Sequence, residues 1–185
     1  MRLFVALDLP RSLRVRLGWM ASGLQGARWV PPENYHVTLR FIGEVPGWRA
    51  EELDHTLAGL RAPGFEVTLA GVGVFEKGGK VGSLWAGVER NAALEHLQAK
   101  IETALHRAGL ESERRRFNPH VTLGRVEGVA AEKIASWVQS NNLFRSDKVT
   151  VEHFTLFRSR LGKEQAVYDA EVEYPLHSFA GAGDL

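Results

Sequence analysis

Hydrophobic positions follow two different periods along this chain. Residues 3–9 form an apolar segment of β-forming residues, and residues 11–24 carry apolar residues at helical spacing. Residues 83–89 and 92–108 repeat the same order later in the sequence. Each pair of segments therefore predicts a β-strand that is followed by an α-helix.

The remaining periodic segments predict two more helices and two β-hairpins. The helices are expected at residues 48–60 and 130–140. Alternating strands are expected at 65–75 and 148–158, and each returns through a loop containing Gly and Lys into the next strand, at 83–89 or 166–174. Helices interspersed with antiparallel hairpins favour an α+β fold.

A tetrapeptide repeat relates the two halves of the chain. His36-Val37-Thr38-Leu39 recurs as His120-Val121-Thr122-Leu123, and the elements around the two copies recur with it. We predict one domain over residues 1–185, with an internal repeat of roughly 1–82 and 83–174. Two lobes of antiparallel sheet, related by an approximate two-fold axis, would carry helices outside and a central active-site cleft between them.

The repeated tetrapeptides place two polar side chains on one face of a strand. Side chains at i and i+2 share a face, so His36 points with Thr38, and His120 points with Thr122. The intervening Val and Leu residues can anchor each strand in a core. Two such strands that face each other would present two imidazoles and two hydroxyls to one small volume.

This set of groups suits hydrolysis of a phosphodiester. One imidazole can deprotonate the nucleophile while the other protonates the leaving oxygen, because histidine titrates near neutral pH. The hydroxyls of Thr38 and Thr122 can hold the non-bridging phosphate oxygens. A lone histidine on a half-buried strand is usually structural, but duplication in two lobes favours the catalytic interpretation.

A zinc site built from the two histidines is an alternative to this chemistry. It would need a third ligand, and no further His, Asp or Glu stands at ligand spacing on either strand. We expect no metal and no cofactor.

Composition narrows the function classes further. The chain has 23 Lys and Arg against 22 Asp and Glu, a net charge of +1, so it lacks the global positive charge of a nonspecific nucleic-acid binder. The absence of cysteine excludes thiolate catalysis and Cys-based metal sites. No apolar run is long enough to span a membrane, and residues 1–9 read as a strand rather than a signal peptide. We expect a cytoplasmic protein without a membrane partner.

The motifs and their flanks resemble a known family. The chain resembles the 2H phosphoesterases, and more closely the RNA 2',3'-cyclic phosphodiesterases historically called 2'-5' RNA ligases. The resemblance spans most of the chain. It is carried by the opening Arg2-Leu3-Phe4-Val5-Ala6, by the segments from His36 to Glu44 and from Phe117 to Arg125, and by the closing Tyr174-Pro175-Leu176.

The resemblance implies a reaction and a role for each motif residue. His36 would donate a proton to the leaving 3'-oxygen and His120 would accept one from water, so that an RNA 2',3'-cyclic phosphate opens to a 2'-phosphomonoester. Thr38, Thr122 and Arg125 would bind the phosphate. Strict alternation puts Arg125 on the face opposite His120, so this role requires a β-bulge near Gly124.

Several other residues are secondary candidates. Lys77, Lys80, Arg158, Arg160 and Lys163 in the hairpin loops, and Arg114 to Arg116 before the second motif, are either phosphate contacts or ordinary solvated charges. Among the aromatic residues Tyr35, Phe41 and Phe117, which could stack a base, Phe41 is expected to be buried because it alternates with His36. The other histidines, His55, His96, His106, His153 and His177, are interpreted as structural or surface residues.

Two other functions use the same residues. A 2'-5' RNA ligase would let a 5'-hydroxyl replace water as nucleophile, although the chain has no P-loop to couple joining to ATP. A binding module for RNA ends would retain the site without turnover. The expected partner in each case is RNA with a 2',3'-cyclic phosphate end, with tRNA fragments and small cyclic nucleotides as candidates, bound by a monomer.

Overall fold

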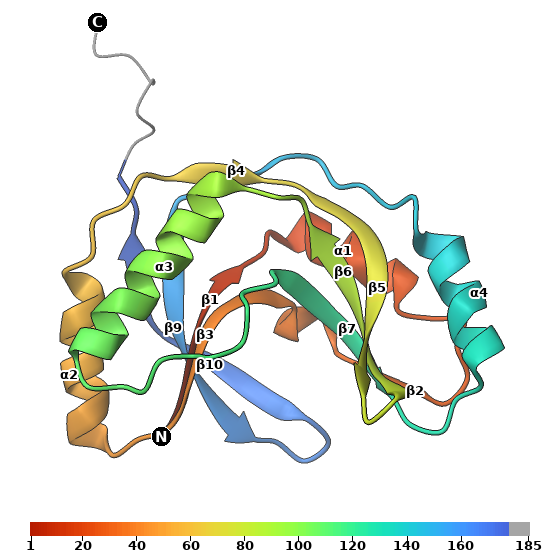
Figure 1. The fold of residues 1–185 in the computed structure, drawn as a ribbon, viewed down its shortest axis with the longest axis horizontal. Helices are drawn as coiled ribbons and strands as arrows, with labels where there is room; N and C mark the ends of the chain where they lie inside the picture. Colours follow the sequence, from red (N-terminus) through yellow and green to blue (C-terminus); the bar gives the residue numbers. More distant parts are fainter. Residues whose placement is uncertain (178–185) are drawn as a thin grey trace, which may run out of the picture.

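Two four-stranded antiparallel sheets lie side by side, flanked by helices (Figure 1). This computed structural model describes residues 1–177; the expected domain over residues 1–185 includes eight residues, 178–185, that lie outside the described part. The elements, in chain order, are β1 (Arg2–Asp8), α1 (Arg11–Met20), β2 (Ala27–Trp29), a 3-10 turn (Pro32–Asn34), β3 (His36–Glu44), α2 (Gly47–Ala58), β4 (Phe65–Val67), β5 (Leu69–Lys77), β6 (Lys80–Val88), α3 (Ala92–Arg107), β7 (His120–Val126), α4 (Ala131–Asn141), β8 (Val149–Val151), β9 (His153–Leu161) and β10 (Ala166–Pro175). The predicted α+β class is confirmed.

The first sheet has the strand order β10-β9-β1-β3 and the second has the order β2-β7-β6-β5. Helices α2 and α3 lie beside the first sheet, and α1 and α4 lie beside the second (Figure 1). Strands β3 and β7, which carry the two tetrapeptides, contact each other between the sheets. The motif strands therefore meet at the centre of the molecule.

The two sequence repeats are interleaved rather than stacked one after the other. The first sheet takes β1 and β3 from the start of the chain and β9 and β10 from its end, whereas the second takes β5, β6 and β7 from the middle. A boundary near residue 82 in the sequence therefore does not separate one sheet from the other.

Two of the predicted strands are each divided in two. The segment expected at 65–75 breaks at Thr68 into β4 and β5, and the segment at 148–158 breaks at Glu152 into β8 and β9. The short first pieces, β4 and β8, pair with each other in a separate two-stranded sheet. A change of pairing partner is not visible in hydrophobic alternation, so the sequence predicts one continuous strand.

The anchor residues of the motif strands lie in the core. The side chains of Val37 and Val121 are completely buried, and Leu39 and Leu123 are 3% and 0% exposed. The first hairpin turns through Gly78 and Gly79, which both have positive φ angles, of 62° and 79°, as a tight hairpin turn requires. No helix within residues 1–177 is long and apolar enough to cross a membrane.

Candidate active site

The two motif histidines are held in the same way at the start of their strands. His36 Nδ1 lies 2.7 Å from the backbone carbonyl oxygen of Asn34, and His120 Nδ1 lies 2.7 Å from the carbonyl oxygen of Asn118. A carbonyl oxygen only accepts hydrogen bonds, so Nδ1 carries the proton in both rings. In a neutral ring this leaves Nε2 without a proton and able to act as a base.

Thr38 contacts the second ring nitrogen of the first histidine. Its Oγ1 lies 2.8 Å from Nε2 of His36. Because Nδ1 of His36 holds the ring proton when the imidazole is neutral, the hydroxyl of Thr38 donates to Nε2 in that state. The predicted alignment of His36 and Thr38 on one face of the strand is therefore present, and the two side chains interact directly.

Burial lowers the pKa of both histidines. For His36, desolvation is the largest cause, the hydrogen bond to Asn34 opposes it by raising the pKa, and the charge of His120 lowers the pKa further. For His120, desolvation again lowers the pKa and the hydrogen bond to Asn118 raises it. Both pKa shifts are downward, so the resting site favours neutral rings.

Aromatic side chains lie against both imidazoles. The ring centroid of Phe4 lies 4.9 Å from that of His36, and Tyr168 meets His36 edge-on at 5.4 Å. On the other strand, Phe75 meets His120 edge-on at 4.7 Å. Each histidine therefore lies against aromatic side chains from other strands of its own sheet.

A cleft of about 950 Å³ is lined mainly by β3, by α3 and by residues 113–120, which lead into β7. Its lining includes two of the predicted site residues, Thr38 and His120, together with aromatic and basic side chains: Phe41, Phe75, Phe117, Arg90, Arg115 and Arg116. We call it the central cleft. His36 does not line the central cleft but lines a separate, smaller pocket of about 150 Å³. Thr122 and Arg125 continue along β7 from His120 but do not line the central cleft.

The β-bulge that the Arg125 hypothesis requires is present. Gly124 pairs with Leu84 and Thr122 pairs with Trp85, so Leu123 is an additional residue in β7. After it, the alternation changes phase, and Arg125 is exposed between buried Gly124 and Val126. Gly124 is needed at this point, because a Cβ atom there would lie 2.7 Å from Cε3 of Trp29.

The first motif strand has the same irregularity, and it overturns one prediction. Arg40 pairs with Val5 and Thr38 pairs with Ala6, so Leu39 is the additional residue in β3. The change of phase turns Phe41 outward, where it is 56% exposed. The expectation that Phe41 is buried was wrong, because it assumed strict alternation from His36.

A buried ion pair supports one wall of the central cleft. Arg40 is 8% exposed, and its Nε donates to Oε2 of Glu102 at 2.6 Å. Further donors of the same guanidinium bond the carbonyl oxygens of Phe41 and Glu111. Oε1 of Glu102 accepts from the backbone N–H of Glu113 at 2.8 Å. Sequence reasoning missed this pair, although a lone Arg among apolar strand residues is a signal for one.

The secondary basic and aromatic candidates differ in whether they line the central cleft. Arg115 and Arg116 line the central cleft, and Phe117 does too, whereas Arg114 does not. The hairpin residue Arg160 pairs with Asp169. Tyr35 is buried, 3% exposed, and burial together with the charge of Glu33 raises its pKa to about 12, so its ring is not free to stack a base.

Comparison with known proteins gives a consistent result. A family model described as the 2'-5' RNA ligase superfamily matches residues 13–163. An RNA 2',3'-cyclic phosphodiesterase of Archaeoglobus fulgidus is 30% identical and aligns over 91% of this chain and 96% of its own. The Thermus thermophilus protein of the same name is 32% identical over 98% of this chain and 93% of its own.

Solved structures share the fold. The chain is similar to Escherichia coli LigT complexed with 3'-AMP, with a TM-score of 0.78 and 27% identity over 95% of this chain and 97% of that one. A crystal structure described as a phosphoesterase has a TM-score of 0.80 and 26% identity, covering 95% of this chain and 98% of its own.

Proposed function

This chain belongs to the 2'-5' RNA ligase superfamily, and we propose that it opens RNA 2',3'-cyclic phosphate ends to 2'-phosphomonoesters. The observation that carries the proposal is the matched pair of imidazoles, each held at Nδ1 by a backbone carbonyl at 2.7 Å. This leaves Nε2 of each ring as the atom that exchanges a proton with the substrate or water. The reaction needs two such atoms, because one proton is taken up and another is released.

The proposed reaction is a single in-line displacement at phosphorus. The oxygen of water attacks phosphorus while Nε2 of His120 takes its proton, and the bond from phosphorus to the 3'-oxygen breaks as protonated His36 delivers its Nε2 proton to that oxygen. After one turnover His36 has lost a proton and His120 has gained one, and exchange with solvent restores both. The direction, with His36 as acid, rests on the resemblance to the family.

The hydroxyls of Thr38 and Thr122 and the guanidinium of Arg125 bind the non-bridging oxygens in this proposal. Bulging of β7 at Leu123 supports the role of Arg125, since it turns that side chain out of the core. Donors aimed at the phosphate act where negative charge develops in the transition state. None of these steps calls for a metal ion or a cofactor.

The composition of the central cleft supports an RNA end as substrate. Phe41, Phe75 and Phe117 offer aromatic faces on which bases can stack. Arg90 and Arg116 offer charge for the backbone phosphates, whereas Arg115 is paired with Glu113 in the same cleft. We propose that a monomer binds a single-stranded end here, with tRNA fragments and small cyclic nucleotides as candidate substrates.

The test is product analysis on a defined RNA. A short RNA ending in a 2',3'-cyclic phosphate is incubated with the protein in EDTA, and phosphorus NMR resolves the products. A 2'-phosphate is expected, and it should be lost in His36→Ala and His120→Ala variants. A 3'-phosphate would contradict the assignment of the leaving group. Binding without product would favour a module for RNA ends, and joining of paired RNA halves without hydrolysis would favour a ligase.

A further inference from the structure

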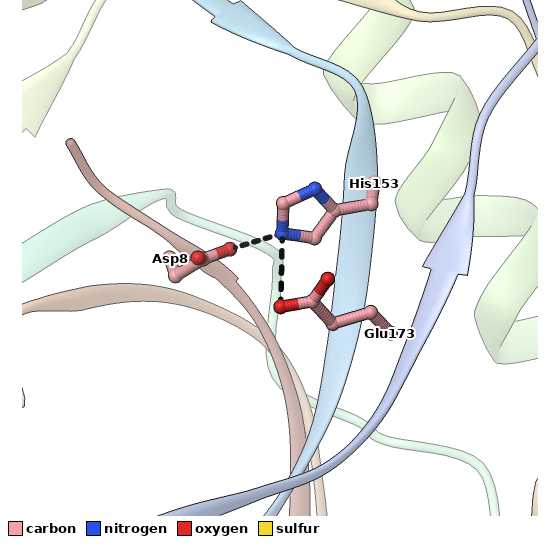
Figure 2. Close-up of side chains that lie close together, drawn as sticks. All are labelled: Asp8, His153 and Glu173. Carbon is pink, nitrogen blue, oxygen red and sulfur yellow. Dashed lines mark hydrogen bonds and ion pairs between the residues drawn. The ribbon is translucent and has the colours of Figure 1, made fainter.

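A second cluster of titratable side chains lies outside the two motifs. Asp8 at the end of β1, His153 at the start of β9 and Glu173 on β10 point toward one another (Figure 2). Nε2 of His153 lies 2.8 Å from Oδ1 of Asp8 and 3.9 Å from Oε1 of Glu173. The three potential ligand atoms all lie within 4.8 Å of one another. Side chains from three neighbouring strands of one sheet thus lie together.

The cluster has an excess of negative charge. Two carboxylates face one imidazole, and within residues 1–177 no Lys or Arg forms an ion pair with either Asp8 or Glu173. Arg14 lines the pocket beside them, yet no ion pair joins its guanidinium to either carboxylate. When His153 is neutral, the cluster carries a charge of about −2, which a divalent cation would balance.

We propose that Asp8, His153 and Glu173 form a binding site for a divalent transition-metal ion. Two carboxylate oxygens and one imidazole nitrogen are a donor set for Zn²⁺ or Mn²⁺ rather than for Ca²⁺, which takes oxygen ligands only. The exposed side chains of Asp8 and Glu173 leave the remaining coordination positions to water.

Unpaired buried hydroxyls in the adjoining pocket support this assignment independently. Asp8 and Glu173 line the pocket of about 150 Å³, and so do Tyr35 and Thr155. Tyr35 and Thr155 are 3% and 1% exposed, and within residues 1–177 Oη of Tyr35 and Oγ1 of Thr155 have no hydrogen-bond partner; neither has Nε of Arg14, which lines the same pocket. Buried polar groups seldom remain unpaired. Waters in the outer shell of an ion could bond both hydroxyls.

The ion would stabilise the sheet rather than take part in the proposed hydrolysis. It would tie the end of β1 to β9 and β10, next to the ladder in which Asp8 pairs with His36. Nε2 of His36 is directed at Thr38, and the proposed proton transfers use no metal. Chelation should therefore lower the melting temperature while leaving cyclic phosphodiesterase activity in place at 25 °C.

Metal binding and its loss in variants test the site. Protein stripped with EDTA and exchanged into chelator-free buffer is titrated with Zn²⁺ by calorimetry and with Co²⁺ by visible absorption. We expect one equivalent per chain. Asp8→Asn and Glu173→Gln should each weaken the affinity at least tenfold. Glu171→Gln is the matched control, because Glu171 is an exposed carboxylate on the same strand outside the cluster, and its affinity should stay within twofold of the unaltered protein.

The outcomes separate this proposal from the proposed function. No saturable binding of either metal, or equal binding by Glu173→Gln and the unaltered protein, would overturn the metal site and leave the hydrolysis untouched. Retained hydrolysis by Asp8→Asn and Glu173→Gln shows that the variants are folded. Loss of hydrolysis in EDTA with restoration by Zn²⁺ would overturn the separation of the ion from the reaction.

Discussion

Thr38 Oγ1 and His36 Nε2 lie 2.8 Å apart, so the hydroxyl assigned to the phosphate is engaged by the proposed acid before substrate arrives. Protonation of His36 on binding an anionic phosphate would release the Thr38 hydroxyl proton from Nε2 toward the substrate. Thr38→Val should then lower kcat roughly 10²-fold, as for the loss of one oxyanion donor, whereas Thr38→Ser should retain most activity. Steady-state kinetics on a cyclic-phosphate dinucleotide measure the difference. Equal rates for the Val and Ser variants would exclude this role.

The two histidines should be individually indispensable. His36→Ala and His120→Ala remove the proposed acid and base, and each is expected to reduce kcat by roughly 10²–10⁴-fold, the range for a positioned acid or base. Combining the two should cost less than the product of the single losses, because either loss alone disables the same step. Single-turnover rates of the three variants provide the measurement. Circular dichroism serves as the control for folding, and a fully active single variant would refute the pair.

The pH dependence follows from the direction of the pKa shifts. Burial lowers the pKa of both His36 and His120 below the ordinary 6.5. Catalysis requires one protonated and one neutral ring. The pH dependence of kcat/KM reports the pKa values of these two groups in the free enzyme. The maximum of kcat/KM should therefore lie below pH 6.5, and kcat/KM should fall about tenfold per pH unit well above both pKa values. A plateau that extends from pH 7 to 9 would contradict this assignment.

Gly124 should be sensitive to the smallest enlargement. A Cβ atom at this position would lie 2.7 Å from Cε3 of Trp29 and 3.2 Å from the carbonyl oxygen of Arg28. Gly124→Ala is expected to destabilise the fold by about 1–3 kcal/mol through overpacking. Urea denaturation measures this. Gly47→Ala is the control, since a Cβ there meets nothing within 4 Å, and a larger loss at Gly47 than at Gly124 would be inconsistent with the packing at the bulge.

The ion pair between Arg40 and Glu102 should matter more than exposed pairs. Glu102→Gln leaves the guanidinium of Arg40 without its counter-charge at 8% exposure, and losing one partner of a buried pair costs about 3–5 kcal/mol. The 22% exposure of Glu102 favours the lower end. Glu52→Gln in the exposed Arg49–Glu52 pair is the matched control and should cost less than about 1 kcal/mol. Comparable losses in the two variants by urea denaturation would argue against this ranking.

The motif pattern was enough to predict that His36 and Thr38 share one face of a strand, because their spacing from the Val and Leu anchors is a local property of that strand. A prediction from the same local alternation was wrong at Phe41. An additional residue at Leu39 changes the phase of the strand, and such a bulge depends on the pairing partner rather than on the residues of β3. The matching bulge in β7 was inferred only because the family resemblance gave Arg125 a role that alternation denied it.

Contacts between distant parts of the chain were outside the reach of the sequence. Arg40 and Glu102 are separated by 62 positions, and Asp8 and His153 by 145. His153 was interpreted as a structural or surface residue because neither Asp8 nor Glu173 is near it in sequence. The carbonyl oxygens of Asn34 and Asn118, which fix Nδ1 of the two motif histidines, belong to the backbone. The identity of a residue does not show where its carbonyl oxygen points.

The order β10-β9-β1-β3 has a consequence for the chain as it is being synthesised. β1 can pair with β3 once Glu44 has been made, but its other neighbour begins only at His153. Synthesis proceeds at about 5–20 residues per second, so one edge of the apolar strand β1 stays unpaired for roughly 5–20 s. During that time the exposed edge can pair with a strand of another chain. The strands β5, β6 and β7, which carry His120, are all made by Val126. A nascent protein therefore completes the surroundings of its second histidine before those of its first.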